Sequence, residues 1–270
     1  MIRNLLLICG LVVSQFSFGA GGQQEVTEAA QLIRKEAADH RLILIGELHG
    51  TREIPKLLAQ LMSAYSTEDP VLLGLEVPHS EQPAFVRFLA SDGSASATSA
   101  LLSGPFWQVH NSQHDGRRSY DMVDLIKHVR RLRAEGRQVD ILTYDNEPTK
   151  TANSEARDKA MADRIREGFA ALPRGRFLVL AGNVHAMLER PSNAPAEMQT
   201  PMGTYLRDLD PFSVDISARN GEFWACTKQC GAVAAHPSSE ASQRTDDGPY
   251  NLLVVLPRLS VAHLIGASPH

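Results

Sequence analysis

The chain has 270 residues, a formal net charge of −4 and 43% hydrophobic residues. Phosphate binding needs a concentrated basic surface, so this mildly acidic balance argues against a nucleic-acid partner. A chain of this length can bury one sizeable α/β core without a second domain.

Residues 1–20 have the features of a secretory signal peptide. Arg3 supplies a positive n-region, residues 5–13 an apolar core, and residues 17–20 a cleavage zone. The apolar run is too short to span a bilayer, and no later stretch reaches that length. We therefore expect residues 21–270 to form one periplasmic or secreted domain without a stable transmembrane anchor.

The first strand expected in the mature domain covers residues 42–48 and runs into the tetrad Gly46-Glu47-Leu48-His49. In an extended segment Glu47 and His49 point to the same side. A neutral imidazole can bind a metal or accept a proton, and a neighbouring carboxylate can orient or charge it. The two residues are catalytic candidates. The alternative is a polar pair that only satisfies itself.

Two further carboxylates follow. Glu53 lies in the first turn of a helix expected over 52–66, where it either binds substrate or complements the helix dipole. Glu76 comes after four apolar residues, near the end of the strand expected over 71–77. A carboxylate there is costly to bury unless it is paired or bound to metal. An exposed strand end is the simpler alternative.

A helix around 80–90 is followed by a polar segment, residues 91–118, which we interpret as a lid or a small helical insertion. Arg117 lies in a polar turn at its end and either holds an anionic substrate group or is solvated. After the helix expected over 119–135 and the strand over 139–144, a charged helix begins near residue 153. Its Arg157 either reaches over the strand ends to bind substrate or forms an exposed ion pair.

A second tetrad, Gly182-Asn183-Val184-His185, follows the apolar strand 177–181. A lone histidine at such a place is usually structural. The matching tetrad on another strand makes His185 a catalytic or metal-binding candidate, with Asn183 as a substrate-binding candidate.

The C-terminal part contains a short helix near 202–209 and two strands, about 212–225 and 250–257, separated by an irregular loop over 232–249. Because no helix separates these two strands, we expect them to pair antiparallel at an edge of the sheet. Cys226 and Cys230 form an even pair in an exported chain. They are either a small-loop disulfide or two free thiols.

The alternation of strands and helices predicts an α/β fold, with a mainly parallel sheet, helices on both faces and antiparallel C-terminal edge strands. Parallel-sheet proteins bind ligands at the carboxyl ends of their strands. His49, Glu76 and His185 are therefore expected to meet there. The chain has no Gly-x-Ser-x-Gly elbow, no phosphate-binding glycine loop and no His-Glu-x-x-His helix.

These residues resemble a superfamily that joins ChaN-type haem-binding lipoproteins, erythromycin esterases, TraB proteins and Tiki proteases, and the ChaN-like branch most closely. The similarity covers residues 41–186. It rests on the two tetrads, on Leu75-Glu76, on Asp115-Gly116-Arg117, and on Arg157-Asp158 followed by Met161-Ala162. The resemblance implies an α/β fold with its site at the strand ends. Its members include metal-dependent proteases, esterases with a histidine base, and haem binders.

The sequence therefore predicts an exported hydrolase of ester or peptide bonds, acting on a small molecule or a peptide. Its catalytic group would be His49, His185, Glu76 and Glu47. The first three either hold a divalent metal such as Zn, Mn or Co, or activate water directly. The alternative hypothesis is a non-catalytic periplasmic protein that binds haem or another small ligand.

Overall fold

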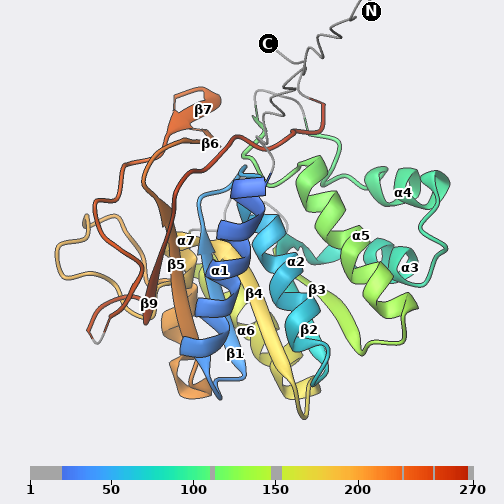
Figure 1. The fold of residues 1–270 in the computed structure, drawn as a ribbon, viewed down its shortest axis with the longest axis horizontal. Coiled ribbons are helices and arrows are strands. Elements are labelled where there is room, and N and C mark those ends of the chain that lie inside the picture. The colour runs from blue at the N-terminus through green and yellow to red at the C-terminus, as the bar shows by residue number, and fades with distance from the viewer. Residues whose placement is uncertain (1–19, 110–112, 147–153, 227, 246, 267–270) are drawn as a thin grey trace, which may run out of the picture.

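A seven-stranded sheet in the order β3-β2-β4-β1-β5-β9-β8 forms the centre of the protein (Figure 1). In this computed structural model the described residues are 20–109, 113–146, 154–226, 228–245 and 247–266, so the predicted signal peptide lies almost wholly outside them. The strands are β1 (Leu42–Glu47), β2 (Val71–Pro78), β3 (Val139–Asp145), β4 (Arg176–Gly182), β5 (Phe212–Ala218), β8 (Gln243–Arg244) and β9 (Leu252–Leu256). All neighbouring pairs are parallel except β8 and β9. The predicted α/β fold is confirmed.

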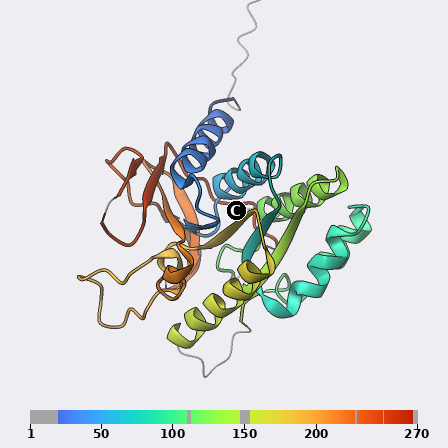
Figure 2. The same ribbon diagram turned by 90° about the horizontal axis from the view of Figure 1, so that it is seen from below.

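Helices cover both faces of this sheet (Figure 2). They are α1 (Ala20–Ala37), α2 (Glu53–Tyr65), α3 (Gln82–Leu89), α4 (Ala95–Leu102), α5 (Tyr120–Ala134), α6 (Ser154–Ala171) and α7 (Asn183–Ala186), with 3-10 helices η1 (His79–Glu81) and η3 (Met202–Leu209). The larger core packs α1, α2, α3 and α5 against one face, and a smaller core packs α6, α7 and η3 against the other. None of the helices in the described ranges is both long and apolar enough to cross a membrane.

Helix α1 was not predicted from the sequence. Its buried positions are Val26, Ala29, Ala30, Ile33 and Ala37. They follow helical spacing, but three of the five are alanines, so the apolar stripe is weak. Helix α4 lies within the predicted polar insertion and packs on α3. A lid movement of this segment stays a prediction.

The expected strand 212–225 is wrong, because the chain leaves the sheet after Ala218. Gly221 has a φ of +113°, and a Cβ there would lie 2.0 Å from the Leu259 carbonyl oxygen, so only glycine fits this turn. Residues beyond it form a separate antiparallel hairpin, β6 (Glu222–Cys226) and β7 (Cys230–Ala234). The chain then returns to the start of the sheet, so β9 pairs parallel with β5, contrary to the expected antiparallel pairing. The antiparallel edge is β8 on β9.

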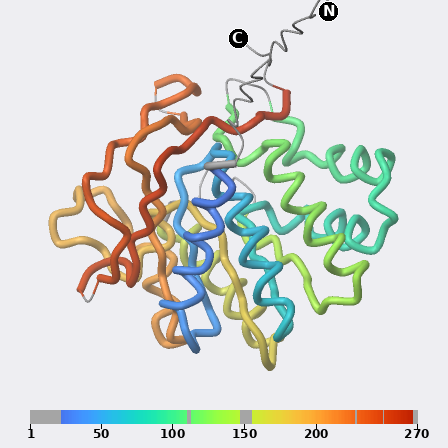
Figure 3. The backbone as a smooth tube through the Cα atoms, viewed as in Figure 1, coloured from blue at the N-terminus to red at the C-terminus, as the bar shows by residue number. Residues whose placement is uncertain are grey.

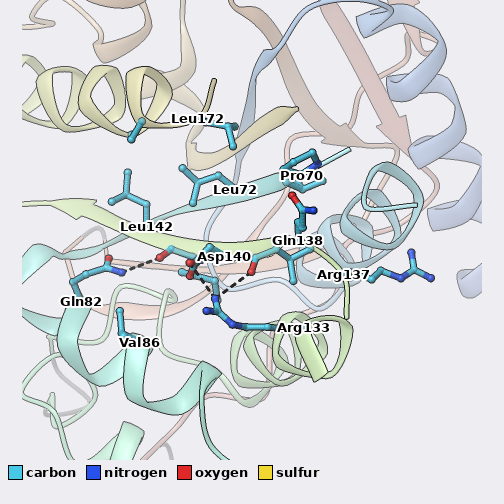
Figure 4. A pocket seen from close by; sticks show the side chains of 15 residues that line it. Pro70, Leu72, Gln82, Val86, Arg133, Arg137, Gln138, Asp140, Leu142 and Leu172 are labelled. Carbon is cyan, nitrogen blue, oxygen red and sulfur yellow. Dashed lines mark hydrogen bonds and ion pairs between the residues drawn. The ribbon is translucent and has the colours of Figure 1, made fainter. Parts of the chain in front are cut away.

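The outer edge of β3 is closed by side chains instead of another strand. The Gln82 amide donates to the Ile141 carbonyl at 2.9 Å and accepts from the Thr143 N–H at 2.7 Å. Asp140 accepts from the Ile141 N–H at 2.9 Å. These contacts lie beside a surface pocket of about 600 Å³ (Figure 4). Unpaired strand edges invite pairing with other chains, and Gln82 removes that opportunity here.

We predict that Gln82→Ala lowers the free energy of unfolding by about 1–3 kcal/mol, because Ile141 and Thr143 each lose a hydrogen-bond partner. Urea unfolding followed by circular dichroism measures the change. Gln138→Ala, at an exposed position on the same pocket, is the matched control and should leave stability unchanged. Equal stability of the two variants would show that Gln82 does not support this edge.

Candidate active site

Glu76 is the centre of the cluster at the carboxyl ends of the strands. The register of β2 against β3 shifts between Leu75 and Pro78, and this bulge surrounds Glu76. The residue is only 6% exposed. Oε1 accepts from Arg157 Nη2 at 2.7 Å and Arg117 Nη1 at 3.2 Å, and Oε2 accepts from the Gly182 N–H at 2.9 Å. Glu76 is therefore a buried, fully partnered carboxylate rather than an exposed strand end.

The surrounding positive charges keep Glu76 ionised. Burial alone would raise the pKa of its carboxyl group. His49, then Arg117, His185 and Arg157 outweigh burial and hold that pKa well below its usual value. The site is therefore built around a fixed negative charge.

Asp145, at the end of β3, ties the two arginines together. Its Oδ2 accepts from Arg157 Nη2 at 2.9 Å and from Arg117 Nη1 at 3.0 Å. Asp115 binds the other side of Arg117, with Oδ2 2.7 Å from Nη2. Burial opposes ionisation of Asp115, but Arg117 outweighs it and lowers the Asp115 pKa to about 2. Both arginines are thus held by carboxylates, and Arg117 is not the solvated side chain considered from sequence.

His49 is paired with Glu47, as the first tetrad predicted. Its Nδ1 lies 3.0 Å from Glu47 Oε1, while Nε2 faces Glu76 Oε2 at 3.7 Å. Burial disfavours the charged ring, but Glu76 and Glu47 outweigh it and raise the pKa of His49. Burial also raises the pKa of Glu47, more than His49 lowers it. The pair therefore holds its proton more tightly than the same groups do in water.

His185 is paired with Asp158, a residue that the sequence did not single out for the site. Asp158 Oδ1 lies 2.6 Å from His185 Nδ1 and accepts from the Met202 N–H at 2.8 Å. Arg157 Nη1 lies 3.1 Å from His185 Nε2. Because a guanidinium can only donate, these contacts assign the proton of the neutral ring to Nδ1. The lone pair on Nε2 is engaged by Arg157.

The two histidine rings meet above Gly182. A Cβ built on this glycine would lie 3.2 Å from His49 Nε2 and 3.4 Å from His185 Cδ2. The side chains of His49, His185 and Arg157 are 23%, 19% and 31% exposed. The site thus offers solvent two imidazoles and one guanidinium, while Glu76 and Asp145 beside them are almost fully buried.

The remaining predicted substrate-binding residues have other contacts. Glu53 accepts from the Ser260 N–H at 2.9 Å. Asn183 begins α7, and its side-chain oxygen accepts from the Val184 N–H at 2.9 Å. Arg157 binds Glu76 and Asp145, in place of the exposed ion pair considered from sequence. Asp145 was predictable by the argument used for Glu76, because it also ends a strand of the parallel sheet.

The donor set does not fit a divalent metal in this arrangement. Within the described ranges, no three histidine, cysteine, aspartate or glutamate side chains come together as a metal site. Arg157 donates to His185 Nε2, and two guanidinium groups hold Glu76. We therefore derive no step through a metal. Binding of Zn, Mn or Co stays a prediction, as does binding of haem.

Replacing Glu76 by glutamine should leave two buried guanidinium groups without their shared charge, and lower stability at neutral pH by about 3–5 kcal/mol. Because the Glu76 pKa is depressed by folding, its contribution exists above the unfolded pKa and is lost as pH falls toward the folded pKa. The gap between wild type and Glu76→Gln should therefore narrow below pH 4.5, the ordinary value.

Urea unfolding at several pH values measures this gap, with Glu167→Gln, at an exposed position on α6, as the matched control. A gap that stays constant down to about pH 3 would contradict the depressed pKa.

No protein-family model matches this sequence, and no curated protein matches it. Solved structures share its fold. A mutant erythromycin esterase in its open conformation has a TM-score of 0.64 at 11% identity, covering 88% of this chain and 95% of the esterase. A succinoglycan biosynthesis protein has a TM-score of 0.65 at 8% identity, covering 93% and 100%. A Bacillus cereus protein has a TM-score of 0.58 at 10% identity, covering 88% and 93%. At such identities the likeness establishes the α/β fold, while membership of the ChaN-like branch stays a prediction.

Proposed function

We propose that the protein is an exported hydrolase that cleaves an ester or peptide bond in a small-molecule or peptide substrate. The observation that carries the proposal is the pair of carboxylate-held histidines, Glu47–His49 and Asp158–His185, beside the ionised Glu76. The similarity in fold to an erythromycin esterase supports the same reaction class. Convergent titratable groups at strand ends are typical of catalytic sites.

His49 is the proposed general base. Its Nδ1 is held by Glu47, which leaves Nε2 of the neutral ring, 3.7 Å from Glu76 Oε2, as the atom that can accept a proton. Water gives a proton to Nε2 as its oxygen attacks the substrate carbonyl carbon. The imidazolium formed is stabilised by Glu47 and Glu76, and it can return the proton to the leaving oxygen or nitrogen.

Arg157 is the proposed stabiliser of the negative oxygen that develops on the carbonyl. Its side chain is 31% exposed, more than those of His49 and His185, yet Asp145 and Glu76 fix its orientation. Donors that are fixed before the reaction stabilise developing charge without reorganising. His185 contacts the same guanidinium at 3.1 Å and is itself held by Asp158. Its proposed role is therefore to position Arg157, and not to act as a second general base.

The test compares wild type with His49→Ala on panels of carboxylic esters and peptides. Loss of the general base should lower kcat by about 100-fold to 10,000-fold with the fold unchanged by circular dichroism. His236→Ala, at an exposed position, is the matched control and should keep wild-type activity. Metal content and haemin binding are measured on the same untagged samples.

If His49→Ala keeps wild-type activity, His49 is not the base. If wild type cleaves no member of either panel but binds haemin in a fixed stoichiometry, the hydrolase proposal is wrong and the ligand-binding alternative replaces it.

A further inference from the structure

The hairpin β6–β7 has no fully buried residue, packs half-buried Phe223 against the larger core, and is closed by a disulfide. It forms a separate two-stranded sheet, and each of its residues is exposed or half-buried. An isolated two-stranded hairpin is only marginally stable in water. The disulfide Cys226–Cys230 joins the two strands at directly paired positions, and Cys226 is exposed. The predicted disulfide is confirmed, and it lies within reach of a reductant.

This hairpin contacts the two segments that carry the candidate site. It lies at the end of the sheet where the parallel strands finish (Figure 3). Trp224 donates from Nε1 to the His114 carbonyl at 2.6 Å and from its backbone N–H to the Gly50 carbonyl at 3.3 Å. The sulfur of Cys226 lies 3.2 Å from the same His114 oxygen. Gly50 directly follows His49, and His114 lies three residues before Arg117.

The backbones of Gly50, Gly116 and Trp224 pack directly against one another. Gly50 and Gly116 both have positive φ, +69° and +95°. A Cβ on Gly116 would lie 2.8 Å from both the Gly50 nitrogen and the Trp224 oxygen, and a Cβ on Gly50 would lie 2.5 Å from Trp224 Cβ. Because the three backbones are in contact, a shift of β6 removes support from both neighbouring segments.

The segment after His114 is shaped by local contacts. Burial, together with Arg118, lowers the pKa of His114, so the neutral ring accepts from the Gly116 N–H at 3.1 Å. Arg117 then reaches both the carbonyl oxygen and the side chain of Glu76. The path from Trp224 to Glu76 therefore consists of hydrogen bonds and adjacent residues through His114, Gly116 and Arg117.

We propose that the disulfide-closed hairpin is a redox-responsive support for the active site, with Trp224 as its positioning residue. A dithiol would reduce the bond: two thiols of the reductant give two electrons and two protons, the S–S bond breaks, and two S–H groups form while the reductant becomes a disulfide. The freed hairpin then ceases to hold residues 114–118. This regulation rests on the proposed hydrolase function, whereas the structural coupling does not.

Hydrogen–deuterium exchange of the full chain, with and without dithiothreitol, tests the coupling independently of any substrate. Reduction should speed exchange in residues 113–119 roughly tenfold, through local opening. Residues 48–52 should respond less, because the Gly50 carbonyl also accepts from the Ala262 N–H at 2.9 Å. Helix α6 should not change. The double variant Cys226→Ser/Cys230→Ser should exchange rapidly with or without the reductant.

A response confined to residues 222–234 would overturn the proposal, and so would a uniform rise that includes α6. Trp224→Phe keeps an aromatic ring but removes the Nε1 donor, and should speed exchange in residues 113–119 with the disulfide intact. Val233→Ala on β7 is the matched control and should not. If the panel finds a substrate, reduction should lower kcat by about tenfold or more with little change in KM. If the hydrolase proposal fails, the exchange experiment still tests the structural coupling between the hairpin and residues 113–119.

Discussion

The ionised carboxylate of Glu76 is the interaction on which the rest of the site depends. A buried carboxylate without partners is costly, and here two guanidinium groups and one backbone N–H offset that cost. These partners come from three separate parts of the chain: the segment before α5 supplies Arg117, α6 supplies Arg157 and the end of β4 supplies Gly182. One charge therefore fixes how the segments at the strand ends meet.

Around this charge the two tetrads take different roles. In both, a carboxylate holds the Nδ1 atom of the histidine. The Nε2 of His49 lies 3.7 Å from Glu76 Oε2, whereas the Nε2 of His185 accepts from Arg157. When the first ring is neutral, no guanidinium engages its Nε2 lone pair, whereas Arg157 engages the Nε2 lone pair of the second ring. The two tetrads are similar in sequence but thus place their histidines in different hydrogen-bond environments.

Strand-end logic located the principal groups from sequence, because parallel strands finish at one edge regardless of how their loops run. His49, Glu76 and His185 do come together in this way. Strand-end reasoning could not identify Asp158 as the hydrogen-bond partner of His185. Asp158 lies on α6, 27 residues away in the chain, and meets His185 only in the folded structure. The predicted direction of β9 was wrong for a similar reason. The absence of a helix suggested an antiparallel return, but the chain after the β6–β7 hairpin runs back to the start of the sheet before β9 begins.

We infer that both neutral rings carry their proton on Nδ1 and direct Nε2 toward the centre of the site. Long-range proton–nitrogen NMR of the histidine side chains, recorded at a pH where both rings are neutral, tests it most directly. We expect a protonated Nδ1 and an unprotonated Nε2 for His49 and for His185, with the resonances assigned by single substitutions. A proton on Nε2 of either ring would contradict the proposed arrangement.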